Sequence, residues 1–559
     1  MGLGILEPKG VDHVPGTTRY FDDPNRPQVA TDENTGLKCD TSGKEPIILI
    51  PQPSDDPNDP LNWPLWKRDL ITFNLCFAAI LATALGPILA ANTLTIAGLF
   101  AKDITQVALL TGYFLLGGGA AAIFFVPSGR IWGKRHLFLL GLVICIFSSA
   151  WAGGAGTNYK SLAAARTIQG VGAAPYESLL NAAVGDLYHV HQRGLRMAFT
   201  NLAVFGGAFF TPILVGLITR EMGWPWTFYL VTIFTAVFFP LVFFFCPETA
   251  YRREAHLNTD SVTEETMLRP PDEANGTHEV KRQAGFVAFP SSGAAQPIGN
   301  ASTPKKSFWE SLSLFDGRKT DDRYWVLLLR PFPLLANPAF VWGCLIQGTM
   351  IGWTVFIGVI VAALFIGPPY LWTEVEAGYA YTGAFVGAVA GFIISGLLAD
   401  TSAKWLTRRN NGIYEPEFRL VLIIPMLIIG GIGLYGFGLT AGRVISREFT
   451  YMPPLVFFAF EVAGMVIGAV ASSLYIVDAY RDLTIEGFTI MIIFKNLLSF
   501  GLTFKAYDWF VKAEVEGTMI PIASVQVGIC MLTVPMYIFG KRVRAFYQRH
   551  DLLAMTGLR

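Results

Sequence analysis

Charged residues are scarce in this 559-residue chain: they make up 15% of it, with 42 Lys and Arg against 42 Asp and Glu. Soluble domains carry about 25% charged residues, so the chain lacks the polar surface that several soluble cores would need. It also lacks the basic excess that is typical of nucleic-acid binding. A large soluble enzyme and a nucleic-acid partner are therefore both disfavoured.

Cysteine is sparse as well. Five of the six cysteines lie scattered inside long apolar runs, which favours apolar packing over disulfides or a metal site. No nucleophile–base constellation, Walker loop or dinucleotide fingerprint occurs in a suitable setting, so we expect neither an enzyme nor a cofactor. The polar first 66 residues contain no signal-peptide core.

Long apolar runs dominate what is present. A run of 18 or more apolar residues predicts a membrane-spanning helix. Nine charge-free runs and three runs with one or two charges meet this pattern, which predicts an all-α integral membrane protein with twelve transmembrane helices. The twelve runs are 70–101, 104–129, 136–159, 161–185, 197–219, 222–247, 340–365, 377–399, 420–442, 454–477, 487–504 and 517–540.

The runs fall into two groups of six. We expect an N-terminal tail (1–66, largely disordered), a six-helix bundle (67–246), a linker (247–338), a second bundle (339–540) and a C-terminal tail (541–559). Basic residues near the ends of the runs place both tails and the linker in the cytoplasm. The sequons at Asn275 and Asn300 would then stay unglycosylated.

Four charges lie well inside the runs: Arg166, Glu177, Glu461 and Lys495. A charge at membrane depth costs several kcal/mol, so a functional role is the default interpretation. The alternatives are structural ion pairs between helices, or side chains that reach the interface.

The fourth run has a polar face. Arg166 and Glu177 are eleven residues apart, which places them within about 20° of each other around a helix, and Gln169 and Asn181 lie within about 60° of the same direction. Small residues separate these polar ones, as expected for a helix that borders an aqueous path. Glu177 lies ~13 Å from Asp186 along the helix, close to the midplane.

Proton coupling would need a carboxylate, because none of the seven His lies within a run. Glu177 is the first candidate. Glu461, ~25 Å from Asp478 and so in the outer part of its helix, is the second. Lys495, beside Asn496, is expected to pair with a carboxylate that the sequence does not identify.

Three motifs carry a family resemblance. Residues 166–173, Arg-Thr-Ile-Gln-Gly-Val-Gly-Ala, resemble the RxxQGxGxA signature in span four of the major facilitator superfamily. Gly207 to Gly216 with Pro212 resembles the GxxxGPxxGG antiporter signature, although Thr211 and Val215 replace two of its glycines. Residues 127–135 are similar to the GxxxDRxGRR gate motif, with Arg130 where that motif has Asp.

Further segments narrow the resemblance to the fungal twelve-span drug:proton antiporters, in the branch that includes a yeast polyamine and cation transporter. These segments are 59–63, 177–194, 247–249, 368–370, 412–420 and 475–481. The resemblance implies two bundles that rock about a cavity lined mainly by spans 1, 4, 7 and 10, with protons driving small organic molecules outward across the plasma membrane. It also implies a role for Arg166 in proton exchange and close helix packing at Gly207, Pro212 and Gly216.

The departure at Arg130 suggests a charge-swapped inner gate. We expect Arg130 to pair with Glu486 at the start of span 11, and Asp400 to face the start of span 5 near Arg196; the alternative is that these loop charges are simply solvated. The other gate candidates are Gly133, Arg135, Asp186 and Asp478.

The leading hypothesis is a monomeric exporter, in the plasma membrane or alternatively the vacuolar membrane, that exchanges a small organic substrate for protons. A proton-coupled importer of polyamines or other organic cations uses the same architecture, and a non-transporting membrane sensor is a third possibility. Residues expected in the cavity are Asn74, Asn92, Gln169, Asn181, Gln347, Trp353, Tyr475, Lys495 and Asn496.

Overall fold

The computed structural model describes residues 3–8, 14–19, 38–40, 47–253, 304–366, 370–445 and 448–558. Most of the expected linker, with the sequons at Asn275 and Asn300, lies outside the described residues. So do Pro368 and Pro369 of the family-like segment 368–370.

The N-terminal half is a series of helices joined by short turns. Several breaks within the expected spans coincide with proline or glycine, which disrupt helix geometry. The elements are η1 (Pro60–Asn62), α1 (Leu65–Ala84), α2 (Thr93–Phe100), α3 (Ile104–Trp132), α4 (Arg135–Gly153), α5 (Tyr159–Ser178), α6 (Leu180–Leu187), α7 (Val190–Asn201), the π-turn η2 (Leu202–Gly206), α8 (Gly207–Met222) and α9 (Pro225–Phe245).

The C-terminal half repeats this plan after two short connecting helices. Its longest helix, α18, contains a kink at Glu514, whose φ of 56° is outside the helical range. The elements are α11 (Phe308–Ser311), α12 (Tyr324–Leu329), η5 (Pro333–Ala336), α13 (Pro338–Ile366), α14 (Glu374–Tyr379), α15 (Thr382–Arg409), η6 (Pro416–Leu422), α16 (Ile423–Ile445), α17 (Met452–Ala479), η7 (Arg481–Leu483), α18 (Thr484–Met531), α19 (Thr533–Arg549) and α20 (Leu552–Met555).

Ten helical stretches in the described part of the chain are long and apolar enough to cross a membrane. The expected count of twelve also needs α1 and α5, which fall short of this measure. α1 contains Lys67, Arg68 and Asp69 near its start, and α5 contains Arg166 and Glu177. These charges lower the hydropathy of α1 and α5, which is why the two helices fall short.

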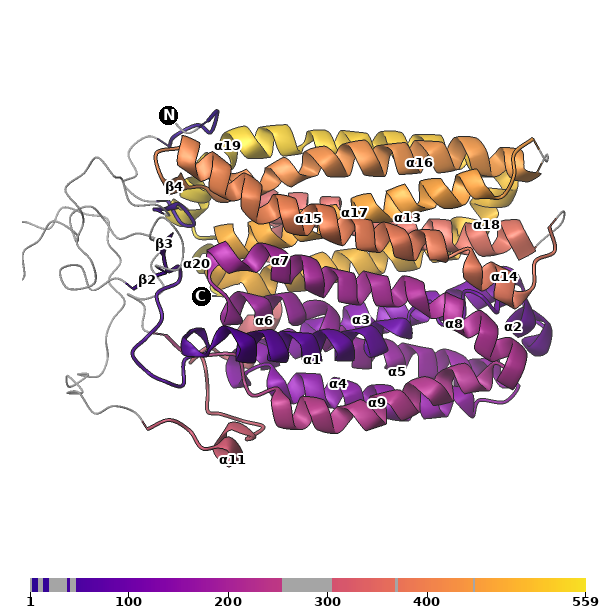
Figure 1. The fold of residues 1–559 in the computed structure, drawn as a ribbon, viewed down its shortest axis with the longest axis horizontal. Helices are drawn as coiled ribbons and strands as arrows, with labels where there is room; N and C mark the ends of the chain where they lie inside the picture. The colour runs from indigo at the N-terminus through magenta and orange to yellow at the C-terminus, as the bar shows by residue number, and fades with distance from the viewer. Residues whose placement is uncertain are drawn as a thin grey trace, which may run out of the picture.

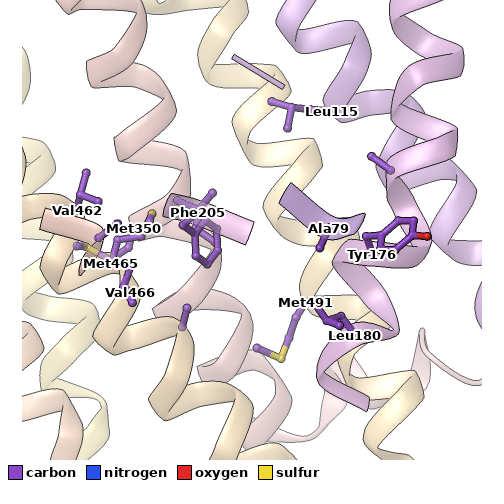
Figure 2. Close-up of a cluster of buried hydrophobic side chains, with 14 of the residues drawn as sticks. Ala79, Leu115, Tyr176, Leu180, Phe205, Met350, Val462, Met465, Val466 and Met491 are labelled. Atoms are coloured by element: carbon purple, nitrogen blue, oxygen red, sulfur yellow. The ribbon is translucent and has the colours of Figure 1, made fainter. Parts of the chain in front are cut away.

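The long helices lie side by side in two groups, one from each half of the chain (Figure 1). Both chain ends lie at the same end of this bundle, which we call the terminal end. One apolar cluster runs through both groups. Figure 2 shows part of it, with Phe205 near Met350, Met465 and Val466 of the other half.

The described parts of the N-terminal segment pack on the terminal end. β1 (Thr18–Arg19) pairs antiparallel with β4 (Ile413–Tyr414), and β2 (Cys39–Asp40) with β3 (Ile47–Ile48). The Leu6 amide donates to the Ile538 carbonyl at 3.0 Å, and the Val190 amide donates to Ile50 at 2.9 Å. These pieces therefore contact both halves of the molecule, an arrangement that composition did not indicate.

Glycine allows close helix contacts, as small residues do in membrane bundles. A Cβ on Gly378 would lie 2.6 Å from the Pro212 carbonyl oxygen, and one on Gly216 would collide with the Glu374 backbone. These contacts join α8 to α14, across the two halves. A Cβ on Gly207 would lie 2.9 Å from the Ile80 side chain of α1. The packing role expected of Gly207, Pro212 and Gly216 remains a prediction.

Gly464 of α17 offers a test of such packing. A Cβ there would lie 2.5 Å from the Cα of Gly430 on α16. We expect G464V to lower the free energy of unfolding by about 1–3 kcal/mol because backbone must move to admit it. Thermal unfolding in detergent measures this. G431V is the matched control, since nothing lies within 4 Å of a Cβ there; equal melting temperatures for the two variants would contradict the packing.

Candidate functional site

A cavity lies between the two bundles, in the half of the molecule away from the terminal end. The volume of this cavity is about 160 Å³. Its walls are largely apolar or hydroxyl-bearing side chains from both halves. The expected helices α1, α5, α13 and α17 contribute to the walls, and so do α3, η2, α8 and α18. Examples of these side chains are Thr111, Phe114, Phe205, Thr354 and Met465.

Glu177 and Lys495 are the charged residues in this wall. Lys495 Nζ lies 2.6 Å from Glu177 Oε2, and the two side chains are only 7% and 9% exposed. The Asn496 amide donates to the same Oε2 at 3.4 Å. Because Glu177 belongs to α5 and Lys495 to α18, this ion pair joins the two bundles at the cavity wall. Glu177 is thus the carboxylate partner of Lys495 that the sequence did not identify.

Arg166 is completely enclosed and does not line the cavity. α1 ends at Ala84, and the carbonyls of the turn that follows it need donors. Arg166 supplies them: its guanidinium donates to the Leu85 carbonyl, to Gly86 at 2.8 Å and to Leu110 of α3 at 3.2 Å. A cation here also complements the negative end of the α1 dipole. Arg166 therefore holds the broken first span against α3 and α5.

Glu461 is fully buried and is separated from the cavity by the side chain of Thr354. The Thr354 hydroxyl, which lines the cavity, donates to Glu461 Oε1 at 2.7 Å. Oε2 has no hydrogen-bond partner among the described residues. A Cβ on Gly433 would collide with the Glu461 backbone, so glycine is what lets α16 lie against it.

Most of the expected cavity residues lie elsewhere. Trp353 donates to Gln526 at 3.0 Å, Asn92 to Thr219 at 3.3 Å, and Asn181 accepts from Thr200 at 2.7 Å. Polar groups buried in a bundle need partners, and these residues find them in helix–helix contacts rather than in the cavity. The residues absent from the cavity wall are Asn74, Asn92, Gln169, Asn181, Gln347, Trp353, Tyr475 and Asn496.

Two of these residues nevertheless belong to the polar interior beside the cavity. Gln169 accepts a hydrogen bond from Arg166 at 2.8 Å, and Asn496 donates to Glu177. Tyr475 instead lies in the apolar core, where its ring packs 5.3 Å from that of Trp342. They support the charged side chains or the core rather than forming the wall.

A buried network closes the terminal end. Asp478 of α17 accepts from Arg193 of α7 at 3.1 Å, from the Tyr414 hydroxyl at 2.6 Å and from Arg419 at 3.1 Å. Arg419 also donates to Asp400 at 3.1 Å. Because Arg193 comes from the N-terminal half and the other four from the C-terminal half, the network holds the two bundles together below the cavity.

Arg130 donates to Glu486 Oε2 at 2.9 Å and to the Asp482 carbonyl at 2.6 Å, so the two residues of the expected charge swap are in contact. Lys134 pairs with Asp186 nearby. The Glu248 carboxylate accepts from the Lys134 and Arg135 amides at 2.9 and 3.0 Å, which caps the start of α4. Gly133, at φ 93°, leaves room for that carboxylate.

Asp400 faces the start of the fifth span, as expected, but Arg196 itself pairs with another carboxylate. Arg196 lies 3.3 Å from Asp69, whereas Asp400 accepts from the Leu195 amide at 3.3 Å and from Arg419. Arg419, from the same bundle as Asp400, supplies the cation. Tyr414, Arg419 and Arg193 are network residues that sequence reasoning did not assign, although each lies in a family-like segment.

His189 and Asp59 are two buried titratable residues at this end. Burial lowers the pKa of His189 to about 3, so its ring stays neutral. Asp59 behaves differently: burial raises its pKa, but the Arg253 guanidinium at 2.7 Å and backbone amides together hold the pKa below its usual value. Ionised Asp59 thereby ties the start of the linker to the turn before α1.

The architecture matches a known family. The family model described as Major Facilitator Superfamily matches residues 71–500, which include most of both bundles and the ion pair between them. The chain belongs to this superfamily. Family and fold both indicate a multi-pass membrane transporter rather than an enzyme.

Relatives within the superfamily extend over nearly the whole chain. The uncharacterized MFS-type transporter C1271.10c of Schizosaccharomyces pombe is 26% identical, with 96% of this chain and 94% of that protein covered. Protein HOL1 of Saccharomyces cerevisiae is 24% identical, with 98% and 97% covered. A structure of the proton:xylose symporter XylE is similar in fold, with a TM-score of 0.54 at 13% identity over 85% of this chain and 96% of XylE.

The contact between Arg130 and Glu486 can be tested by charge reversal. We expect R130E and E486R each to lower transport by about tenfold, the factor that corresponds to ~1.4 kcal/mol, and the double variant to recover most of it. Transport by each variant in proteoliposomes is the measurement. R323E, at an exposed position, is the control. A double variant no better than the singles would count against a paired gate.

Proposed function

We propose that this transporter exports small organic molecules, cationic or amphipathic in character, across the plasma membrane in exchange for protons. It acts as a monomer, with both termini and the linker in the cytoplasm. The observation that carries the proposal is the Glu177–Lys495 ion pair, which joins the two bundles at the cavity wall.

The pair supplies a way to couple protons to movement. Separated from water, a carboxylate and an ammonium attract each other strongly, and each is costly to leave alone. A proton that binds to Glu177 cancels the attraction and loosens the link between α5 and α18. A cationic substrate can instead take the place of Lys495 beside Glu177. Proton and substrate then compete for one carboxylate, and this competition makes their transport an exchange.

Alternating access requires a second set of contacts that break in turn. The Asp478 network closes the terminal end while the cavity lies in the opposite half. Opening toward the cytoplasm must separate Arg193 from Asp478 and Arg130 from Glu486. The described state is therefore assigned to the outward-facing side of the cycle.

The cavity walls favour an amphipathic substrate. Phe114, Phe205 and Phe209 supply apolar and aromatic surface, and Glu177 supplies a single negative group. Aromatic faces also attract organic cations. The proton:xylose symporter XylE has a similar fold, which is compatible with proton coupling here. Glu461 remains the second candidate for the proton, reached from the cavity through Thr354.

E177Q tests the coupling. The amide keeps the shape of the side chain but cannot take up and release a proton. In proteoliposomes with an imposed pH gradient, we expect uptake of an organic cation driven by that gradient to fall by about tenfold or more, the factor equivalent to ~1.4 kcal/mol or more. Substrate exchange without a gradient should be less affected. E461Q is the matched control, since it removes the other buried carboxylate of the cavity region; coupled transport that survives in E177Q and disappears in E461Q would transfer the role to Glu461.

Direction is tested separately. We expect cells that express the chain to retain less labelled spermidine, or less of a cationic dye, than cells with the E177Q variant. Net accumulation driven by an inward proton gradient would instead establish the importer.

A further inference from the structure

The stretch of the linker that directly precedes the second bundle in the sequence exposes an unusual amount of aromatic surface. We call residues 304–336 the collar. Trp309 is 75% exposed and Trp325 71%. Exposed side chains of this size are rare on soluble surfaces unless something covers them. The other exposed apolar residues of the collar are Phe308, Leu314, Phe315, Leu329, Phe332 and Leu335.

Contacts fix the height of the collar along the bundle. Arg135 donates to the Ser311 carbonyl at 2.6 Å and to the Phe243 carbonyl at 2.7 Å, so α11 lies level with the last turn of α9. The Tyr324 hydroxyl donates to the Phe124 carbonyl of α3 at 2.9 Å. In Figure 1, α11 lies beside the terminal end of the bundle. The collar thus lies where the apolar faces of α3 and α9 end.

Behind the collar is a polar pocket of about 800 Å³. Its four carboxylates are engaged. Asp316 pairs with Lys306 and Lys319, and Asp56 accepts from the Tyr251 hydroxyl and the Asn58 side chain. Glu248 caps α4, and Glu310 caps α11. Lys67 and Lys305 line the same pocket. Among the described residues, neither is paired with a carboxylate.

Lys67 is placed for an interfacial role. Its ammonium lies 3.9 Å from the centre of the Trp63 ring, at the start of α1. Lysine beside tryptophan at the end of a spanning helix is the arrangement expected at the boundary between headgroups and acyl chains.

We propose that the collar lies on the membrane and that its pocket binds the phosphate of an anionic phospholipid. Trp309, Phe315 and Trp325 enter the boundary between headgroups and acyl chains. Lys67 and Lys305 face the headgroup. With the topology proposed above, the lipid comes from the cytoplasmic leaflet, whose negative surface attracts basic residues. The placement of the collar on the membrane rests on the exposure and the contacts of its residues, and it does not depend on proton coupling.

Spin-label accessibility tests the placement of the collar. The full chain, with Cys39 replaced by Ser, carries W309C, W325C or D321C in nanodiscs. We expect labels at 309 and 325 to be relaxed more by oxygen, which dissolves in lipid, than by a water-soluble nickel chelate. The label at 321 should show the reverse, because Asp321 is 78% exposed and pairs with Arg252 outside the bundle. Equal nickel accessibility at all three positions would overturn the proposal.

Lipid retention tests the pocket. Native mass spectrometry of the chain extracted from mixed phosphatidylcholine and phosphatidylserine should show bound phosphatidylserine. K67Q and K305Q should each weaken this retention by about fivefold, the effect of one basic residue near an anionic surface. K102Q, at the opposite end of the bundle, is the control and should retain it fully. Unchanged retention in the K67Q/K305Q double variant, or displacement of the lipid by inorganic phosphate, would contradict a phospholipid site.

Discussion

The structure depends most on one ion pair. Glu177 and Lys495 are the charges that meet at the cavity wall, and they come from opposite bundles. Neither is stable alone in such surroundings, because desolvation of an isolated charge costs several kcal/mol. Each charge therefore stabilises the other in this buried position. Neutralisation or replacement of one of them would weaken the contact between the bundles. In the proposed mechanism, these two atoms, Glu177 Oε2 and Lys495 Nζ, couple the chemistry of the cavity to the movement of the bundles.

The other buried charges have a different task. Arg166 uses its donors on carbonyls at the break after α1, and it needs no carboxylate among the residues that it contacts. The Asp478 network binds Arg193 across the bundle boundary while Arg419 and Tyr414 hold the carboxylate within its own half. Arg166 supports the cavity from behind, and the network closes the end of the path. Neither lies at the cavity wall, where Glu177 and Lys495 are the charged residues among those described.

The sequence was sufficient for the membrane architecture because span length and charge content follow directly from bilayer thickness. It also singled out Glu177 and Lys495, since a charge within an apolar run is conspicuous. Their pairing was not predictable, because α5 and α18 meet only in the folded molecule. Asn92 and Trp353 were expected in the cavity because they are polar or aromatic residues of the first and seventh spans, but in this structure they contact Thr219 and Gln526 of other helices. Residue type alone does not separate a cavity wall from a helix–helix contact. Arg419 was missed as a partner of Asp400 because the sequence contains no signal for which bundle supplies the cation.

Difference infrared spectroscopy of the purified transporter tests the central claim most directly, since a carboxylic acid and a carboxylate absorb at different frequencies. On acidification, the account predicts a carbonyl band of a protonated carboxyl group that is absent from E177Q and is suppressed when an organic cation is added to the wild-type chain. A band that persists unchanged in E177Q, or that an added cation leaves untouched, would contradict a carboxylate shared between proton and substrate.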